Sequence, residues 1–156
     1  MQGSLTVLDL STNVETTKHI RRVQELLLRI ICELQVRAIK HDASKLENPE
    51  VSVFSEYTPK LKNSVYLSDE YKIFLQEMQV ALKHHYACNA HHPEHYSNGV
   101  DGMSLVDVIE MLCDWKAASE RHDTGDVYKS IELNATRFSL DKQLICILKN
   151  TVGFLK

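Results

Sequence analysis

Helix-breaking residues are scarce in this chain, and their scarcity is the strongest constraint on its fold. The 156 residues include five glycines and three prolines, so few positions interrupt a helix. Apolar residues recur at helical spacing over long stretches, whereas the alternating pattern of strands is nearly absent. The length suits one domain with one core. The sequence therefore predicts an all-α fold, a single-domain bundle of about six to seven helices over residues 1–156.

The first predicted helix carries a recognisable start signal. Thr12 and Glu15 have the spacing of a capping box. The apolar residues that follow keep helical spacing: Val23, Leu26, Leu27, Ile30 and Ile31. A second helical stretch, "ELQVRAIKHDASK", continues from it without glycine or proline.

Later helices are bounded by prolines and by serine caps. Pro49 lies near the start of a short helix, and Pro59 is expected beyond its end. Ser68 and Ser104 are each expected to cap a longer helix, with the turn "NGVDG" between these two helices. Two more helices are expected at about residues 127–137 and 140–154.

Charge and composition narrow the range of partners. The net charge of −3 and the pI near 6.2 argue against a protein that binds a nucleic-acid backbone. No apolar run approaches the roughly 20 residues of a membrane span, and the N-terminus lacks the pattern of a secretion signal. The four cysteines form no CxxC pair, which is typical of reduced thiols. A cytoplasmic protein without a membrane partner is expected, and its oligomeric state is open.

Histidine is concentrated in the stretch "KHHYACNAHHPEHY", residues 83–96. This stretch holds five of the eight histidines: His84, His85, His91, His92 and His95. It is either a polar surface tract or part of a metal site whose other ligands lie elsewhere in the chain.

Other candidate ligands lie on both sides of this tract. His19 stands in the first helix, and His41 and Asp42 are adjacent in "KHDASK". In the apolar helix "LVDVIEMLCDW", three carboxylates form one stripe: Asp107, Glu110 and Asp114. A carboxylate on so apolar a helix needs a cation or good hydrogen bonds, and Asp114 is the preferred ligand. The alternative is a solvated stripe, with Asp107 favoured by the helix N-terminus.

The order of these residues resembles that of the HD-domain superfamily of metal-dependent phosphohydrolases. "HIRRV" resembles its first motif, and "KHDASK" resembles its His-Asp motif. "HHPEHYSNGVDG" followed by "DWKAASERH" is similar to the HD-GYP branch, although the GYP signature itself is missing. Residues 19–137 resemble more closely a group of small phage and bacterial proteins that have no established activity.

The resemblance implies a set of metal ligands. His19, His41, Asp42 and Asp114 would be the basic set. One of His84 or His85 and one of His91 or His92 would complete a second metal position. His85 is preferred over His84 because it shares an apolar helix face, and His91 and His92 are both retained. Glu15 is either a helix cap or an extra ligand.

The implied activity is hydrolysis of a nucleotide or related phosphoester by water at a di-metal site. Imidazole and carboxylate ligands without thiolate suit Mn, Fe, Mg, Ni or Zn. The residues assigned to catalysis are Lys45, Asp42 and Glu94, and the cations assigned to substrate phosphate are Lys45, Lys116 and Arg121. His95 and His122 are candidate proton donors. A di-iron oxygenase and a non-catalytic helical interaction protein are the alternatives.

This ligand set requires His19 and His41 to lie close together in the fold. One straight helix would separate His19 from His41 by roughly 33 Å, which is too far for ligands of one centre. The chain must therefore turn between them, and a break is expected near residues 32–36. A continuous helix from Thr12 to Ala43 would contradict the metal-site interpretation.

Overall fold

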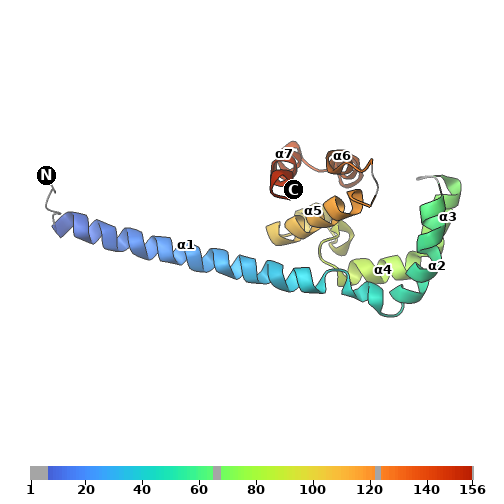
Figure 1. Cartoon of the computed structure of the whole chain (residues 1–156), viewed down its shortest axis with the longest axis horizontal. Coiled ribbons are helices and arrows are strands. Elements are labelled where there is room, and N and C mark those ends of the chain that lie inside the picture. Colours follow the sequence, from blue (N-terminus) through green and yellow to red (C-terminus); the bar gives the residue numbers. More distant parts are fainter. Residues whose placement is uncertain (1–6, 65–67, 122–123, 156) are drawn as a thin grey trace. The chain divides into compact units, whose positions relative to one another are not determined.

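The structure, a computed structural model, describes residues 7–64, 68–121 and 124–155, and every regular element in this part is helical (Figure 1). The predicted all-α class is confirmed, with seven α-helices in the described part of the chain. The chain divides into two units, residues 1–39 and 40–156, where the sequence predicts one domain. All residues of the site described below, except for the one histidine that is discussed separately, belong to the second unit.

Helix α1 (Val7–Lys40) is one unbroken helix of 34 residues (Figure 1). It begins before Thr12, so the predicted capping box is wrong, and Glu15 instead accepts a hydrogen bond from Lys18 Nζ at 2.7 Å. The predicted break near residues 32–36 is also wrong. That stretch lacks glycine and proline, and an Arg37–Glu33 ion pair of 2.9 Å supports the helix across it. In the described part of the chain, no helix combines the length and apolar character that a membrane crossing requires.

Three helices form the first part of the second unit. They are α2 (Glu50–Asn63), α3 (Asp69–Glu77) and α4 (Gln79–Cys88). The Ser68 cap is confirmed, because its side chain accepts a hydrogen bond from the Tyr71 backbone N–H at 3.1 Å. Pro59 lies inside α2 and not beyond it, which corrects the predicted end of this helix. Helices α2 and α4 pack against each other, and this contact brings the start of α2 close to the histidines of α4.

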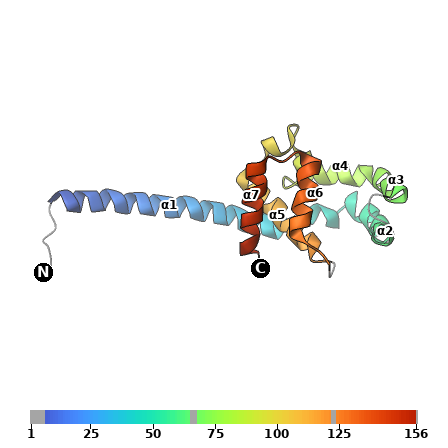
Figure 2. The same ribbon diagram turned by 90° about the horizontal axis from the view of Figure 1, so that it is seen from above.

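The apolar core lies among the last three helices. They are α5 (Leu105–Ser119), α6 (Val127–Phe138) and α7 (Lys142–Thr151). Helices α6 and α7 lie side by side, and α5 packs against α6 (Figure 2). The most deeply buried core side chains are Met111, Leu112, Ile131 and Leu148. Burial of each such side chain stabilises the fold by about 1.5–3 kcal/mol, and this core holds α5 in place.

Short 3-10 helices lie between the α-helices and after α7. They are η1 (Ala43–Leu46), η2 (Pro93–His95), η3 (Gly99–Gly102) and η4 (Val152–Phe154). The predicted turn "NGVDG" is confirmed by η3. Gly102 is required there, because a Cβ atom at this position would lie 2.8 Å from Tyr96 Cβ. The Tyr96 hydroxyl in turn donates to Asp107 at 2.9 Å, which fixes the histidine-bearing loop to α5.

Candidate metal centre

Imidazoles and carboxylates from four segments converge within the second unit. His41 and Asp42 follow the end of α1, and His85 lies on α4. His91 and His92 lie in the loop between α4 and η2. The fourth segment is α5, whose residues Glu110 and Asp114 are four positions apart and therefore share one helix face.

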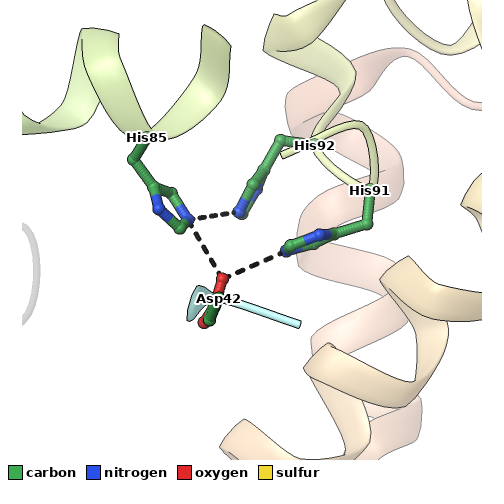
Figure 3. Close-up of side chains that lie close together, drawn as sticks. All are labelled: Asp42, His85, His91 and His92. Atoms are coloured by element: carbon green, nitrogen blue, oxygen red, sulfur yellow. Dashed lines mark hydrogen bonds and ion pairs between the residues drawn. The ribbon is translucent and has the colours of Figure 1, made fainter. Parts of the chain in front are cut away.

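The first group of ligand atoms comes from Asp42, His85, His91 and His92 (Figure 3). These atoms all lie within 4.8 Å of one another. His85 Nε2 is 3.3 Å from Asp42 Oδ1 and 2.9 Å from His92 Nε2, and His91 Nε2 is 3.6 Å from Asp42 Oδ1. Two ring nitrogens thus contact Asp42 Oδ1 and the third lies beside His85 Nε2, which is a donor arrangement that can hold a divalent cation.

Two further groups overlap the first. His41, Asp42 and Asp114 form one of them, with His41 Nε2 at 3.6 Å from Asp42 Oδ2 and 3.7 Å from Asp114 Oδ1. His41, His91 and Glu110 form the other. Asp42 therefore presents Oδ1 to His85 and His91 and Oδ2 to His41.

The backbone at Asp42 takes an unusual conformation. Its φ of 55° and ψ of 15° lie in the left-handed region, which aspartate adopts more readily than most residues. This conformation ends the helical run of α1 and begins η1. Non-glycine residues in such regions cluster at functional sites because their surroundings must hold them there.

Two buried polar atoms in this centre lack a hydrogen-bond partner among the described residues. They are Asp42 Oδ1 and His91 Nε2. Buried polar groups are nearly always hydrogen-bonded, so each exception needs an explanation. A cation between these two atoms would satisfy both, since each offers a lone pair. The residues present therefore fit a metal ion.

The outer nitrogens of the rings contact two other carboxylates. Glu110 Oε1 lies 3.0 Å from His41 Nδ1 and 3.2 Å from His91 Nδ1. Glu50 Oε2 lies 2.8 Å from His85 Nδ1. Three rings are thus held at Nδ1 from outside, while their Nε2 atoms face the centre.

Comparison with protein-family models identifies the family of this chain. The model of a family of unknown function, DUF5662, matches residues 9–153, which is nearly the whole chain. The chain belongs to the DUF5662 family. No curated protein and no solved structure matches it. For the DUF5662 protein, function must therefore be argued from the site itself.

Electrostatics in the DUF5662 protein keep His41 charged and two other imidazoles neutral when no metal is bound. The Asp114 carboxylate, together with Glu110 and Asp42, raises the pKa of His41 to about 9 against the opposing effect of burial. Burial, reinforced by the neighbouring His91 and His85, lowers the pKa of His92 to about 3. Burial also lowers the pKa of His91. Neutral imidazoles are the form that binds metal.

The two carboxylates of the centre remain ionised. Burial alone would raise the pKa of Asp42, but the Lys45 ammonium and the nearby His41 and His85 hold it below its ordinary value. In the same way, contact with His41 outweighs burial and lowers the pKa of Asp114. Both side chains are therefore available as anionic ligands at neutral pH.

His19 is the one predicted ligand that the structure does not bring to the centre. Its side chain is exposed on α1, and it belongs to none of the ligand groups found in the described part. Because α1 is unbroken to Lys40, His19 lies roughly 30 Å along the helix axis from the residue that precedes His41. The turn that was expected to bring His19 next to His41 is absent, so His19 is left out of the ligand set proposed below. The continuous helix does not contradict the other six ligands, since all of them follow Lys40.

The structure distinguishes the members of each histidine pair. His85 is 2% exposed and faces the centre, as the sequence predicts. His84 is 39% exposed and contacts Glu50 through Nδ1 at 2.7 Å. His91 and His92 both belong to the first ligand group, in agreement with their joint retention.

The residues assigned to catalysis and phosphate binding lie at different distances from the centre. Lys45 Nζ lies 2.5 Å from Asp42 Oδ2, at the edge of the centre. Glu94 is exposed on η2, is paired with Arg137 at 2.6 Å, and lies outside the ligand groups of the described residues. Its catalytic assignment gains no support from this placement.

Lys116 and Arg121 are not placed at the centre by any described contact. Lys116 is two residues beyond Asp114, on the opposite face of α5, and pairs with Glu120. Arg121 lies beyond the end of α5 at Ser119. Of the candidate proton donors, His95 contacts the Tyr86 backbone oxygen through Nδ1 at 2.7 Å. His122 lies outside the described residues.

The three carboxylates of the acidic stripe on α5 have different partners. Asp107 lies in the first turn of α5, where it forms a capping box with Ser104, and it is buried rather than solvated. Asp114 faces His41 Nε2 at the centre, whereas Glu110 contacts the outer Nδ1 atoms of His41 and His91. Sequence reasoning missed Glu50, because a single glutamate after Pro49 gives no local sign of its distant partners.

Proposed function

We propose that this protein is a metal-dependent phosphohydrolase of the HD type that acts on a nucleotide or a related phosphoester. The proposal is supported by the convergence of six of the seven predicted ligands, although they come from four separate segments. It is also supported by the order of the motifs along the chain, in which His41-Asp42 precedes the histidine tract and Asp114.

Two cation positions follow from the division of Asp42 between its neighbours. Asp42 Oδ1, His85, His91 and His92 would hold one divalent ion. The second ion would be held by Asp42 Oδ2, His41 and Asp114. Asp42 would bridge the two positions, one oxygen to each.

The single observation that carries this proposal is the pair of buried, unsatisfied atoms Asp42 Oδ1 and His91 Nε2. A surface histidine tract would be solvated, and its polar atoms would bond to water. Here an imidazole nitrogen and a carboxylate oxygen are buried, lie 3.6 Å apart, and have no hydrogen-bond partner among the described residues. Such groups are costly to bury without a partner, and a bound cation provides one.

A divalent ion bound there would supply a water of lowered pKa and would offset the charge of a phosphoryl oxygen. The chain's own contribution is to orient and to bind. Lys45 Nζ lies at the edge of the centre and above the Phe54 ring, 5.8 Å from its centroid. The Lys45 ammonium can exchange its contact with Asp42 for a contact with a substrate phosphate oxygen, whose charge it would offset.

The donor set also suits iron, since four imidazoles and two carboxylates without thiolate are borderline ligands. An oxygen-activating di-iron site is therefore the second candidate. A helical interaction protein that merely binds metal is the third. Both alternatives retain the ligands and differ in the reaction.

The test combines metal content with phosphate release. Purified protein is supplied in turn with Mn, Mg, Ni and Fe, and release of inorganic phosphate is measured from a nucleotide panel and from simple phosphoesters. We expect turnover in the wild type, with loss of both turnover and metal in Asp42→Ala. Asp101→Asn, which removes an exposed carboxylate, should keep both. Consumption of oxygen without phosphate release would favour the oxygenase, and bound metal without any turnover would favour the interaction protein.

A further inference from the structure

Glu50, the first residue of α2, is a fully buried carboxylate next to the candidate centre. Its exposed fraction is 0%. A buried carboxylate must be well paired to be tolerated. Glu50 belongs to none of the ligand groups found among the described residues, so a metal ion is not its direct partner.

Both oxygens of Glu50 contact imidazoles of α4. Oε1 lies 2.7 Å from His84 Nδ1, and Oε2 lies 2.8 Å from His85 Nδ1. An ionised carboxylate only accepts hydrogen bonds, so both ring nitrogens must donate to it. This arrangement places the proton of a neutral His85 ring on Nδ1 and leaves a lone pair on Nε2.

The surrounding polar groups are consistent with this proton position. Asn89 Nδ2 lies 3.1 Å from His85 Nδ1, but this amide donates to Ser44 Oγ at 2.8 Å and to the His85 carbonyl at 2.8 Å. An amide group has two hydrogens, and these two bonds use both of them. His85 Nδ1 is therefore not required as an acceptor for Asn89 and can donate to Glu50.

We propose that Glu50 is a positioning residue that fixes the tautomer and the ring orientation of His85, so that His85 Nε2 faces Asp42 and His92. His84 holds the other oxygen of Glu50 and so fixes the carboxylate from the exposed side. The role of Glu50 toward a metal rests on the cation site assigned under the proposed function. It does not depend on the reaction that the site performs.

Glu50 matters for metal binding because the neutral His85 ring has two tautomers, and only one of them leaves Nε2 free to bind a cation. Without an acceptor at Nδ1, a neutral ring can carry its proton on Nε2, which then cannot bind a cation. Loss of such outer carboxylates typically weakens metal binding by about 10–100-fold. The charge of Glu50 also makes the His85 ring a stronger donor to a cation.

The experiment uses the full chain and compares four variants with the wild type. Glu50→Leu removes the acceptor, and Glu50→Gln keeps the shape but removes the charge. His84→Ala leaves the contact between Glu50 and His85 in place. Glu47→Gln changes an exposed glutamate three residues away and is the matched control. The readouts are the Zn²⁺ dissociation constant, from competition with a chelator, and the ¹⁵N NMR signals of the histidine rings in metal-free protein.

We expect wild-type His85 to carry its proton on Nδ1. Zn²⁺ binding should weaken about 10–100-fold in Glu50→Leu and less in Glu50→Gln and His84→Ala, and it should stay within about threefold in the control Glu47→Gln. The inference is overturned by wild-type His85 protonated on Nε2, or by unchanged Zn²⁺ affinity in a folded Glu50→Leu variant. If Glu50→Leu does not fold, Glu50→Gln and the wild-type NMR signals decide. Wild-type protein that binds Zn²⁺ but releases no phosphate would count against the phosphohydrolase and leave the role of Glu50 standing.

Discussion

His91 Nε2 lies 3.6 Å from Asp42 Oδ1, and both atoms are buried without a hydrogen-bond partner in the described part of the chain. The loop after α4 and the turn after α1 therefore meet at a pair of groups that the protein alone does not satisfy. Each unsatisfied buried group costs about 1–3 kcal/mol. In the proposed account this cost is offset when a cation binds between them.

The first prediction concerns the His91 side chain. Because its Nε2 is unsatisfied without metal, His91→Leu should leave metal-free protein at least as stable as the wild type. The same variant should lose most of the stabilisation by metal, which for the wild type is about 2.7 kcal/mol at a metal concentration 100 times Kd. Thermal unfolding with and without Mn²⁺ measures both effects. An equal rise in Tm for wild type and variant would count against a ligand role for His91.

The second prediction concerns the pH dependence of metal-free protein. Burial lowers the pKa of His92 to about 3, whereas the unfolded chain takes up this proton near pH 6.5. Stability should therefore fall as the pH drops from about 6.5 toward 3. The carboxylates Asp42 and Asp114 add losses only near their ordinary pKa of about 4 and below.

His41 should act in the opposite direction. Its folded-state pKa of about 9 lies above the unfolded value of 6.5. Its contribution is therefore complete below pH 6.5 and is lost as the pH rises toward 9. Urea unfolding in the presence of a chelator should thus show maximal stability near pH 6.5. His92→Gln should flatten the acidic side of this profile, and His41→Gln should flatten the alkaline side. A profile that neither variant changes would contradict these assignments.

The third prediction separates Lys45 from the metal ligands. Lys45 Nζ contacts Asp42 Oδ2 but is not itself a ligand, so Lys45→Met should retain bound metal. Its loss should raise the KM for a phosphate substrate by about tenfold, as expected for one charge-assisted contact. Lys116→Met is the control, because Lys116 pairs with Glu120 on the opposite face of α5. Equal effects of the two variants on KM would argue against a phosphate contact for Lys45.

The fourth prediction follows from the unbroken helix α1. His19→Ala should keep the metal content of the wild type, whereas His41→Ala should lose metal. Metal analysis of the two purified variants checks this directly. A matching loss of metal in His19→Ala would show that His19 is a metal ligand and would contradict this prediction.

Local patterns were sufficient for much of the fold and for most of the site. The serine caps at Ser68 and Ser104 were predictable because capping depends on residues within one turn. His85 was predictable because its helical spacing places it on the apolar face of α4. Residue type and order also indicated that Asp42, His91 and Asp114 belong together, but not which atoms meet.

Other features depended on information that no local pattern holds. The break expected in α1 was inferred only from the need for His19 to approach His41. The helix is unbroken, because the stretch contains neither glycine nor proline. Glu50 could not be predicted, because its partners lie on a helix that begins 29 residues later. Its burial results from the packing of α2 against α4.

The most direct test of the central claim is anomalous diffraction from crystals grown with Mn²⁺. We expect two ions that share Asp42. One ion should lie at about 2.0–2.2 Å from Nε2 of His85, His91 and His92, and the other at a similar distance from His41 Nε2 and an oxygen of Asp114. Anomalous density elsewhere, or a centre that stays without metal at millimolar Mn²⁺ with the same side-chain arrangement, would contradict it.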